Sequence, residues 1–147
     1  DTPLDIVNAL KPSKILRIMK DPVKSANAVE LVYTNDQSAE GITRKKYGKK
    51  FHYYLDGVRI NDQQEIARIN KLAIPPAWEQ VWICALNNGH LQATGIDTKQ
   101  RKQYRYHPVW NALRNHTKFY RMLQFGYALP KIRLQIEQDL SKKRKCS

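Results

Sequence analysis

The sequence is poor in the residues that build metal sites and disulfide scaffolds. It has two cysteines, Cys84 inside an apolar run and Cys146 near the end, and neither has a CxxC partner. The four histidines are scattered without an HxxxH pair. We therefore expect two reduced thiols and no metal ion.

Long apolar segments are also missing. No stretch approaches the roughly 20 consecutive apolar residues of a membrane-spanning helix. The first ten residues include Asp1 and Asp5 and lack the charged and apolar regions of a signal peptide. We expect a soluble protein in the cytoplasm, with no membrane partner.

Acidic residues are absent from Thr98 to Ile136, a segment that carries nine lysines and arginines. Across the whole chain, 26 Lys and Arg oppose 13 Asp and Glu, which gives a formal charge of +13. A field of this sign attracts polyanions, but it does not by itself separate DNA from RNA. The charge therefore predicts the class of partner and no more.

Cationic, amide and aromatic side chains alternate from Lys99 to His107. Side chains of these types contact phosphates and base edges together on nucleic-acid-binding surfaces. We expect a nucleic-acid-binding element here. The alternative is a solvated basic strand whose tyrosines pack into a core.

The pattern of the chain predicts an α+β fold with a small, mainly antiparallel sheet, one packed helix and two C-terminal helices. Residues 1–28 contain three prolines and few regularly spaced apolar residues, and Pro12 and Asp21-Pro22 break any long helix. We expect a loosely ordered lead-in with short helical turns there. A β-rich domain should follow over residues 29–108, and a helical segment over 109–147.

Short apolar or alternating runs predict the strands, and turn residues separate them. Asp56-Gly57 and Asn88-Gly89 predict tight turns, and a helix should begin at Asp62 with Glu65 completing a capping box. Its apolar stripe is Ile66, Ile69 and Ala73, and it must end before Pro75-Pro76. The expected strands are 31–34, 42–44, 51–55, 58–60, 81–86, 90–94 and 103–107.

Two basic segments have two interpretations each. The tip of the first hairpin, residues 45–50, contains four lysines around Tyr47, and it is either a solvated turn or a phosphate contact. Residues 141–145 imitate a localisation signal or form a solvated connector.

Beyond Pro108, Trp110 and Leu113 begin an apolar helical pattern, and a second pattern starts at Pro130. We expect the packing partner of these two helical patterns to lie outside the chain.

Several strings carry a family resemblance: residues 67–78, Val81-Trp82-Ile83, residues 89–95, Asp97, and residues 101–107. Over roughly residues 31–140, the chain resembles the amino-terminal portion of bacterial type IB DNA topoisomerases, the branch similar to the poxvirus enzymes. The resemblance implies a two-domain monomeric clamp around duplex DNA, at the bacterial nucleoid. It also implies that the catalytic domain, a partner of this portion, relaxes supercoils through a 3′-phosphotyrosyl intermediate without metal or nucleotide cofactors.

The strings do not include that family's catalytic arginines, lysine, histidine or nucleophilic tyrosine. We therefore assign no catalytic residue and expect this chain to bind DNA without relaxing it. The resemblance carries major-groove contacts over to Arg101, Gln103, Tyr104 and Tyr106. Further expected phosphate contacts are Lys99, Lys102, Lys49 and Lys50.

Side chains alternate between the two faces of a regular strand, so the four groove residues at 101, 103, 104 and 106 cannot all share one face. A bulge or a strand end is needed if all of them contact DNA. Inward packing is the alternative for the two tyrosines.

The competing function is a stand-alone, ribosome-associated RNA-binding module, which would prefer RNA over B-form DNA. An independent nuclease has little support, because no carboxylate cluster for metal ions stands out.

Overall fold

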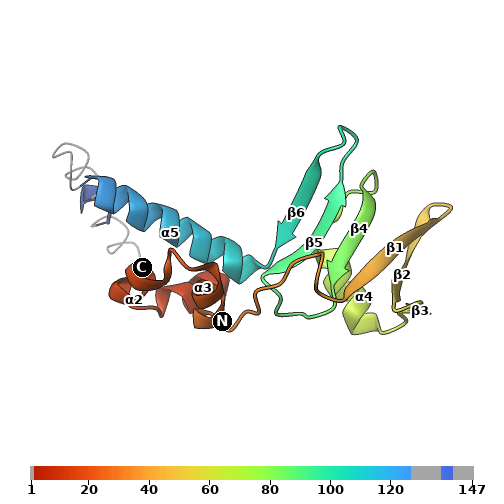
Figure 1. Ribbon diagram of the computed structural model, residues 1–147, viewed down its shortest axis with the longest axis horizontal. Coiled ribbons are helices and arrows are strands. Elements are labelled where there is room, and N and C mark those ends of the chain that lie inside the picture. The colour runs from red at the N-terminus through yellow and green to blue at the C-terminus, as the bar shows by residue number, and fades with distance from the viewer. Residues whose placement is uncertain (1, 127–136, 141–147) are drawn as a thin grey trace.

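The computed structural model describes residues 2–126 and 137–140. A six-stranded antiparallel sheet, ordered β3-β2-β1-β4-β5-β6, forms one end of the molecule in Figure 1. This arrangement confirms the predicted α+β class, and it leaves β3 and β6 at the two edges. The strands are β1 (Gly41–Tyr47), β2 (Lys50–Leu55), β3 (Val58–Arg59), β4 (Glu79–Cys84), β5 (Leu91–Ile96) and β6 (Lys102–Tyr106).

Helix α4 (Gln63–Lys71) covers one face of the sheet and buries Ile69 against it. Trp78 packs in the same core and lies so close to β5 that a Cβ at Gly95 would be 2.7 Å from its Cε3 atom. Glycine at this position therefore keeps the indole against the strand. The buried members of this core are Ile42, Ile69, Trp78, Val81, Ile83 and Ala93.

The start of α4 differs in part from the prediction. The Asp62 side chain accepts a hydrogen bond from the Gln64 N–H at 3.0 Å, as a helix cap should. The Glu65 carboxylate accepts from Arg68 Nε instead of the cap amide, so the predicted capping box is wrong. Ala73 is exposed beyond the helix with φ at 51°, and Leu72 packs against the core in its place.

The turn at Asp56-Gly57 forms as predicted, whereas the tip of the first hairpin is shorter than predicted. Asp56 and Gly57 both have positive φ and join β2 to β3, which confirms that turn. The first hairpin turns at Gly48 (φ 61°), so Lys45 and Lys46 belong to β1 and not to its tip.

The two-residue turn predicted at Asn88-Gly89 is wrong, because six residues separate β4 from β5. Gly89 instead pairs with Val32 in an isolated parallel bridge, and this bridge is all that forms of the strand expected over 31–34. A Cβ at Gly89 would lie 2.6 Å from Cys84 Sγ, so the loop can approach the sheet only with glycine there.

Strand β5 is buried on both faces, whereas the sequence predicts only Leu91 and Ala93 inward. Residues 91–95 are all buried. The α4 core covers one face, and on the other the Thr94 hydroxyl donates to Asp36 Oδ2 at 3.0 Å. The loop before β1 therefore forms a second cover that alternation along β5 does not reveal.

Residues 3–28 form three short helices: α1 (Pro3–Asn8), α2 (Pro12–Ile18) and α3 (Pro22–Ala28). Each begins with a proline, which suits the first helical turn, where the missing N–H is not needed. Thr2 and Asp5 form a capping box on α1, and the Asp21 side chain caps α3. The prolines that break a long helix in the sequence therefore start short ones.

Helix α5 (Pro108–Gly126) confirms the helix predicted after His107. Val7 of α1 and Ala26 of α3 are fully buried against it in one apolar cluster. The amino-terminal helices are thus a packing partner of α5 that the sequence analysis did not predict, and a further partner outside the chain stays a prediction. The buried members are Val7, Ala26, Val29, Leu31, Val109, Trp110 and Leu113.

The second C-terminal pattern is described only in part. Residues 137–140 are helical, while 130–136, the basic segment 141–145 and Cys146 lie outside the described residues.

His90 joins the helices to the sheet, and the residue is 5% exposed. Its Nδ1 accepts a hydrogen bond from the Thr34 N–H at 2.9 Å. The ring stacks on Tyr33 at a centroid distance of 4.2 Å and meets Trp110 of α5 edge-on at 4.9 Å. One imidazole therefore contacts the segment before β1 and the first turn of α5.

Replacing Val7 by alanine tests the packing of the amino-terminal helices. Val7→Ala should lower the free energy of unfolding by about 2 kcal/mol, because buried methyl groups are lost and a cavity is left. Leu4→Ala in the same helix is the control and should change it by less than about 0.5 kcal/mol, since Leu4 is 55% exposed. Equal effects in urea denaturation would contradict the packing described.

Stability should fall as the pH is lowered from 7.5 to 5.5. Burial lowers the pKa of both His90 and His107 below the ordinary value of 6.5. Near pH 6 the unfolded chain therefore binds more protons than the folded one, and the free energy of unfolding decreases. Urea denaturation at both pH values measures the change.

His107→Asn is the matched variant for this pH effect. His107 Nδ1 accepts a hydrogen bond from the Val109 N–H at 3.1 Å, and an asparagine side chain can accept the same bond without titrating. The variant should keep its stability at pH 7.5 and lose less than the wild type at pH 5.5. A pH dependence identical to that of the wild type would refute the role of His107.

Candidate nucleic-acid interface

A tight turn at residues 97–101 leads into β6, and the Asp97 carboxylate organises it. Its Oδ1 accepts the backbone N–H groups of Lys99 and Arg101, each at 2.9 Å. The Asp97 N–H donates to the Arg101 carbonyl at 3.0 Å, and Gln100 adopts a positive φ of 62°. The hydrogen bond from the Arg101 N–H is the main reason that the pKa of Asp97 lies below its usual range, so the carboxylate stays charged.

The same carboxylate holds two of the predicted groove residues. Its Oδ2 accepts from Arg101 Nε at 3.2 Å and from Gln103 Nε2 at 3.0 Å. The Arg101 side chain is 64% exposed, whereas that of Asp97 is 14% exposed. Arg101 and Gln103 therefore share one anchor, while the arginine keeps donors available to solvent.

Tyr104 and Tyr106 lie on the opposite face of β6. Their rings stack at a centroid distance of 6.1 Å with 13° between planes. Gln103 pairs with Gly95 and Tyr104 with Thr94, so the register places them on opposite faces, as alternation requires. Tyr104 is 44% exposed, and Tyr106 packs partly against the apolar cluster of α5. The alternative of inward packing thus holds for part of the Tyr106 side chain, whereas Tyr104 remains largely accessible to solvent.

Lys102 has an acidic partner that the sequence did not reveal. Its Nζ lies 2.5 Å from Asp36 Oδ2. The interaction raises the pKa of Lys102 and lowers that of Asp36, and the two directions agree. Lys102 and the Thr94 hydroxyl therefore share Asp36 Oδ2, and Lys102 Nζ lies 5.6 Å from the centroid of the Tyr104 ring.

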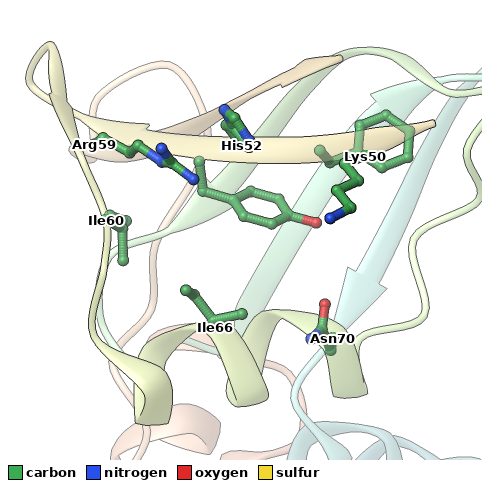
Figure 2. A pocket seen from close by; sticks show the side chains of 8 residues that line it. Lys50, His52, Arg59, Ile60, Ile66 and Asn70 are labelled. Atoms are coloured by element: carbon green, nitrogen blue, oxygen red, sulfur yellow. The ribbon is translucent and has the colours of Figure 1, made fainter. Parts of the chain in front are cut away.

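Lys49 and Lys50 lie at the first hairpin, away from β6, and both are exposed. Four strand spacings separate β2 from β6, which is about 19 Å. Lys50 also lines a hollow of about 280 Å³ between β2 and α4, with His52, Arg59 and Asn70 around it (Figure 2). The structure therefore brings Arg101 and Gln103 together and leaves the hairpin lysines as a separate group, while Lys99 is exposed in the turn.

Further cationic and aromatic side chains share the face of Tyr104, and the sequence analysis did not select them. The register through Thr43, Trp82 and Thr94 places Tyr54 on that face. Lys45 lies 5.0 Å from the Tyr54 ring centroid, and Tyr47 stacks on His52 at 4.7 Å. The period-two spacing of residues 45 and 47, and of 52 and 54, is the signal that would have found them.

Two arginines of this basic chain serve the fold instead. Arg44 donates to the carbonyls of Ile74, Pro75 and Trp78 at 2.9 to 3.4 Å. Arg105 lies over the Trp78 ring, 5.0 Å from its centroid, on the α4 side of the sheet. Neither arginine lies on the sheet face that carries Tyr104. That face therefore carries less positive charge than the number of basic residues in the sequence suggests.

Within residues 2–126 and 137–140, no group of three or more His, Cys, Asp or Glu side chains could hold a metal ion. The same part of the chain has no helix long and apolar enough to cross a membrane.

Comparison with known proteins identifies the family. Residues 50–97 match the family "Bacterial DNA topoisomerase IB, N-terminal domain". The chain is 41% identical over 108 residues to the DNA topoisomerase 1B of Acanthamoeba polyphaga mimivirus. That similarity covers 73% of this chain and 32% of the viral protein, so the chain spans about a third of this relative. No solved structure matches the chain significantly. The chain belongs to the type IB DNA topoisomerase family and corresponds to its amino-terminal portion.

Proposed function

We propose that this portion binds duplex DNA by placing β6 in the major groove. The observation that carries the proposal is that β6 is an edge strand. The major groove of B-form DNA is about 12 Å wide and admits a two-stranded ribbon such as β5–β6. An edge strand in a groove can present both of its faces, so Arg101 and Gln103 on one side and Tyr104 and Tyr106 on the other can all approach DNA without a bulge in β6.

The side chains suit this task. Arg101 keeps donors for a phosphate or for guanine, and Gln103 can pair with adenine. The tyrosine hydroxyls can donate to phosphates. Lys99 in the turn, and Lys49 and Lys50 about 19 Å away across the sheet, would contact backbone outside the groove. Lys102 would do so only by leaving Asp36 or sharing its ammonium with it.

Membership of the family supports a proposal for the activity of the whole protein. We propose that it relaxes supercoiled DNA as a monomer at the bacterial nucleoid, through a 3′-phosphotyrosyl intermediate and without a metal or nucleotide cofactor. We assign no catalytic residue to this chain, and we place that chemistry in a catalytic domain that closes over the other face of the duplex. This chain alone should bind DNA and relax none.

An RNA-binding module is the second candidate. The aromatic side chains on the face of Tyr104, including the exposed Tyr47 and the half-buried His52, favour it, because unpaired bases stack on such rings. The two functions differ in the shape of nucleic acid they prefer. The deep, narrow major groove of an RNA duplex would not admit β6.

Fluorescence anisotropy with a DNA duplex, its single strand and an RNA duplex at two salt concentrations tests the proposal. We expect the DNA duplex to bind best, in roughly the 10⁻⁴ to 10⁻⁶ M range at physiological salt. Arg101→Ala with Gln103→Ala should weaken duplex binding. The matched control is Arg59→Ala with Gln64→Ala, which removes the same residue types at exposed positions of β3 and α4. Tighter RNA binding, or equal effects of the two pairs, would overturn the groove assignment.

A double-mutant cycle tests whether Asp97 positions Gln103 for DNA. Asp97→Asn keeps an oxygen for the Lys99 and Arg101 N–H groups, but its amide cannot accept from Gln103 Nε2 in the same orientation. The cost of Gln103→Ala in duplex affinity should therefore be smaller in the Asp97→Asn background, by at least about 0.5 kcal/mol. Strict additivity of the two substitutions would show that the contact at 3.0 Å has no role in binding.

A further inference from the structure

A row of three cations follows one side of α5. Arg114, Lys118 and Arg121 stand at i, i+4 and i+7, a spacing that places side chains one above another along a helix. All three are exposed. Their span along the helix axis is about 10 Å. We call these three residues the α5 stripe.

The α5 stripe begins where β6 ends. The Arg114 guanidinium lies over the Tyr106 ring, 5.4 Å from its centroid, and Tyr106 in turn stacks on Tyr104. In Figure 1, α5 runs away from the end of β6 toward the opposite end of the molecule. The proposed groove strand and the α5 stripe therefore form one continuous surface, joined at the contact between Tyr106 and Arg114.

The stripe differs from the groove strand, where Asp97 binds Arg101 and Asp36 binds Lys102. The ion pairs of Arg68, Arg101 and Lys102 do not involve the α5 stripe. The stripe borders a hollow of about 240 Å³ between α5 and the helices α2 and α3, and no carboxylate lines that hollow. No carboxylate therefore compensates the positive charge of the stripe within this hollow, which Trp110 and Leu113 of the apolar cluster also line.

We propose that the α5 stripe binds backbone phosphates of the same duplex that β6 enters. The inference rests on the proposed function, and it extends the interface from the groove strand onto the helical end of the protein. One strand of B-form DNA carries a charge about every 3.4 Å along the axis, so the 10 Å stripe spans about three phosphates. Contacts of this kind set the position of the protein on the duplex and carry no sequence information.

The test is the salt dependence of duplex affinity for Lys118→Gln with Arg121→Gln, in the full 147-residue chain. Each lost phosphate contact lowers the slope of log K against log salt by about 0.9, so the slope should become shallower by about 1.8. The loss should be the same for duplexes of different sequence. Arg59→Gln with Lys71→Gln removes one arginine and one lysine at exposed positions of β3 and α4, far from α5, and should change the slope by less than about 0.5.

The charge-conserving pair Lys118→Arg with Arg121→Lys controls for damage to α5. It should retain the wild-type slope, and thermal denaturation should give all variants the same midpoint as the wild type. Equal slopes for the α5 pair and the control pair would overturn the stripe. If the α5 pair instead lost affinity for an acidic peptide while its slope for DNA stayed unchanged, the stripe would be assigned to a protein partner, and this too would overturn the proposal.

The failures of the two proposals are distinguishable. If the wild type prefers the DNA duplex and Arg101→Ala with Gln103→Ala weakens it, while the α5 pair behaves as its control, only the stripe fails. If the wild type shows no duplex preference, the groove assignment fails whatever the α5 pair does.

Discussion

The buried His90 imidazole is the contact on which the arrangement of the two ends of the molecule depends. It accepts the Thr34 N–H, stacks on Tyr33 and meets the edge of Trp110. Its backbone also pairs with Val32 and with His107, at 2.9 and 2.8 Å. The segment before β1, the start of β5 and the start of α5 are thus fixed relative to one another, and with them the angle at which α5 leaves the sheet.

The positive charge of the chain divides into two functional groups. Arg44 and Arg68 donate to backbone carbonyls, and Arg68 also binds Gln92 and Glu65. These guanidiniums satisfy buried oxygens and hold α4 and its following loop to the sheet. Asp36 and Asp97 instead stand beside the proposed DNA-binding strand, each engaging the cations nearest to it. The acidic residues next to β6 therefore orient the basic ones and do not only reduce their charge.

Local sequence signals predicted those elements whose structure depends on local interactions. The Asp56-Gly57 turn, the Asp62 cap and the alternation of Gln103 and Tyr104 are set by residues within a few positions of one another. Several of the errors involve distant partners. Gly89 bridges Val32 and Asp36 reaches Thr94 and Lys102, while Val7 packs on α5; none of these pairs leaves a periodic trace in the sequence. The position of β6 at the sheet edge likewise depends on the strand order, which no single segment specifies.

The edge position of β6 has a consequence for the protein when it is free of DNA. An edge strand exposes unpaired N–H and C=O groups that another chain can use to extend the sheet, and proteins commonly prevent this with charged side chains on that strand. Arg101, Lys102 and Arg105 supply such charges on and beside β6. Arg101 and Lys102, which we propose to contact DNA, therefore have a second effect: their charges oppose edge-to-edge association of two copies through β6.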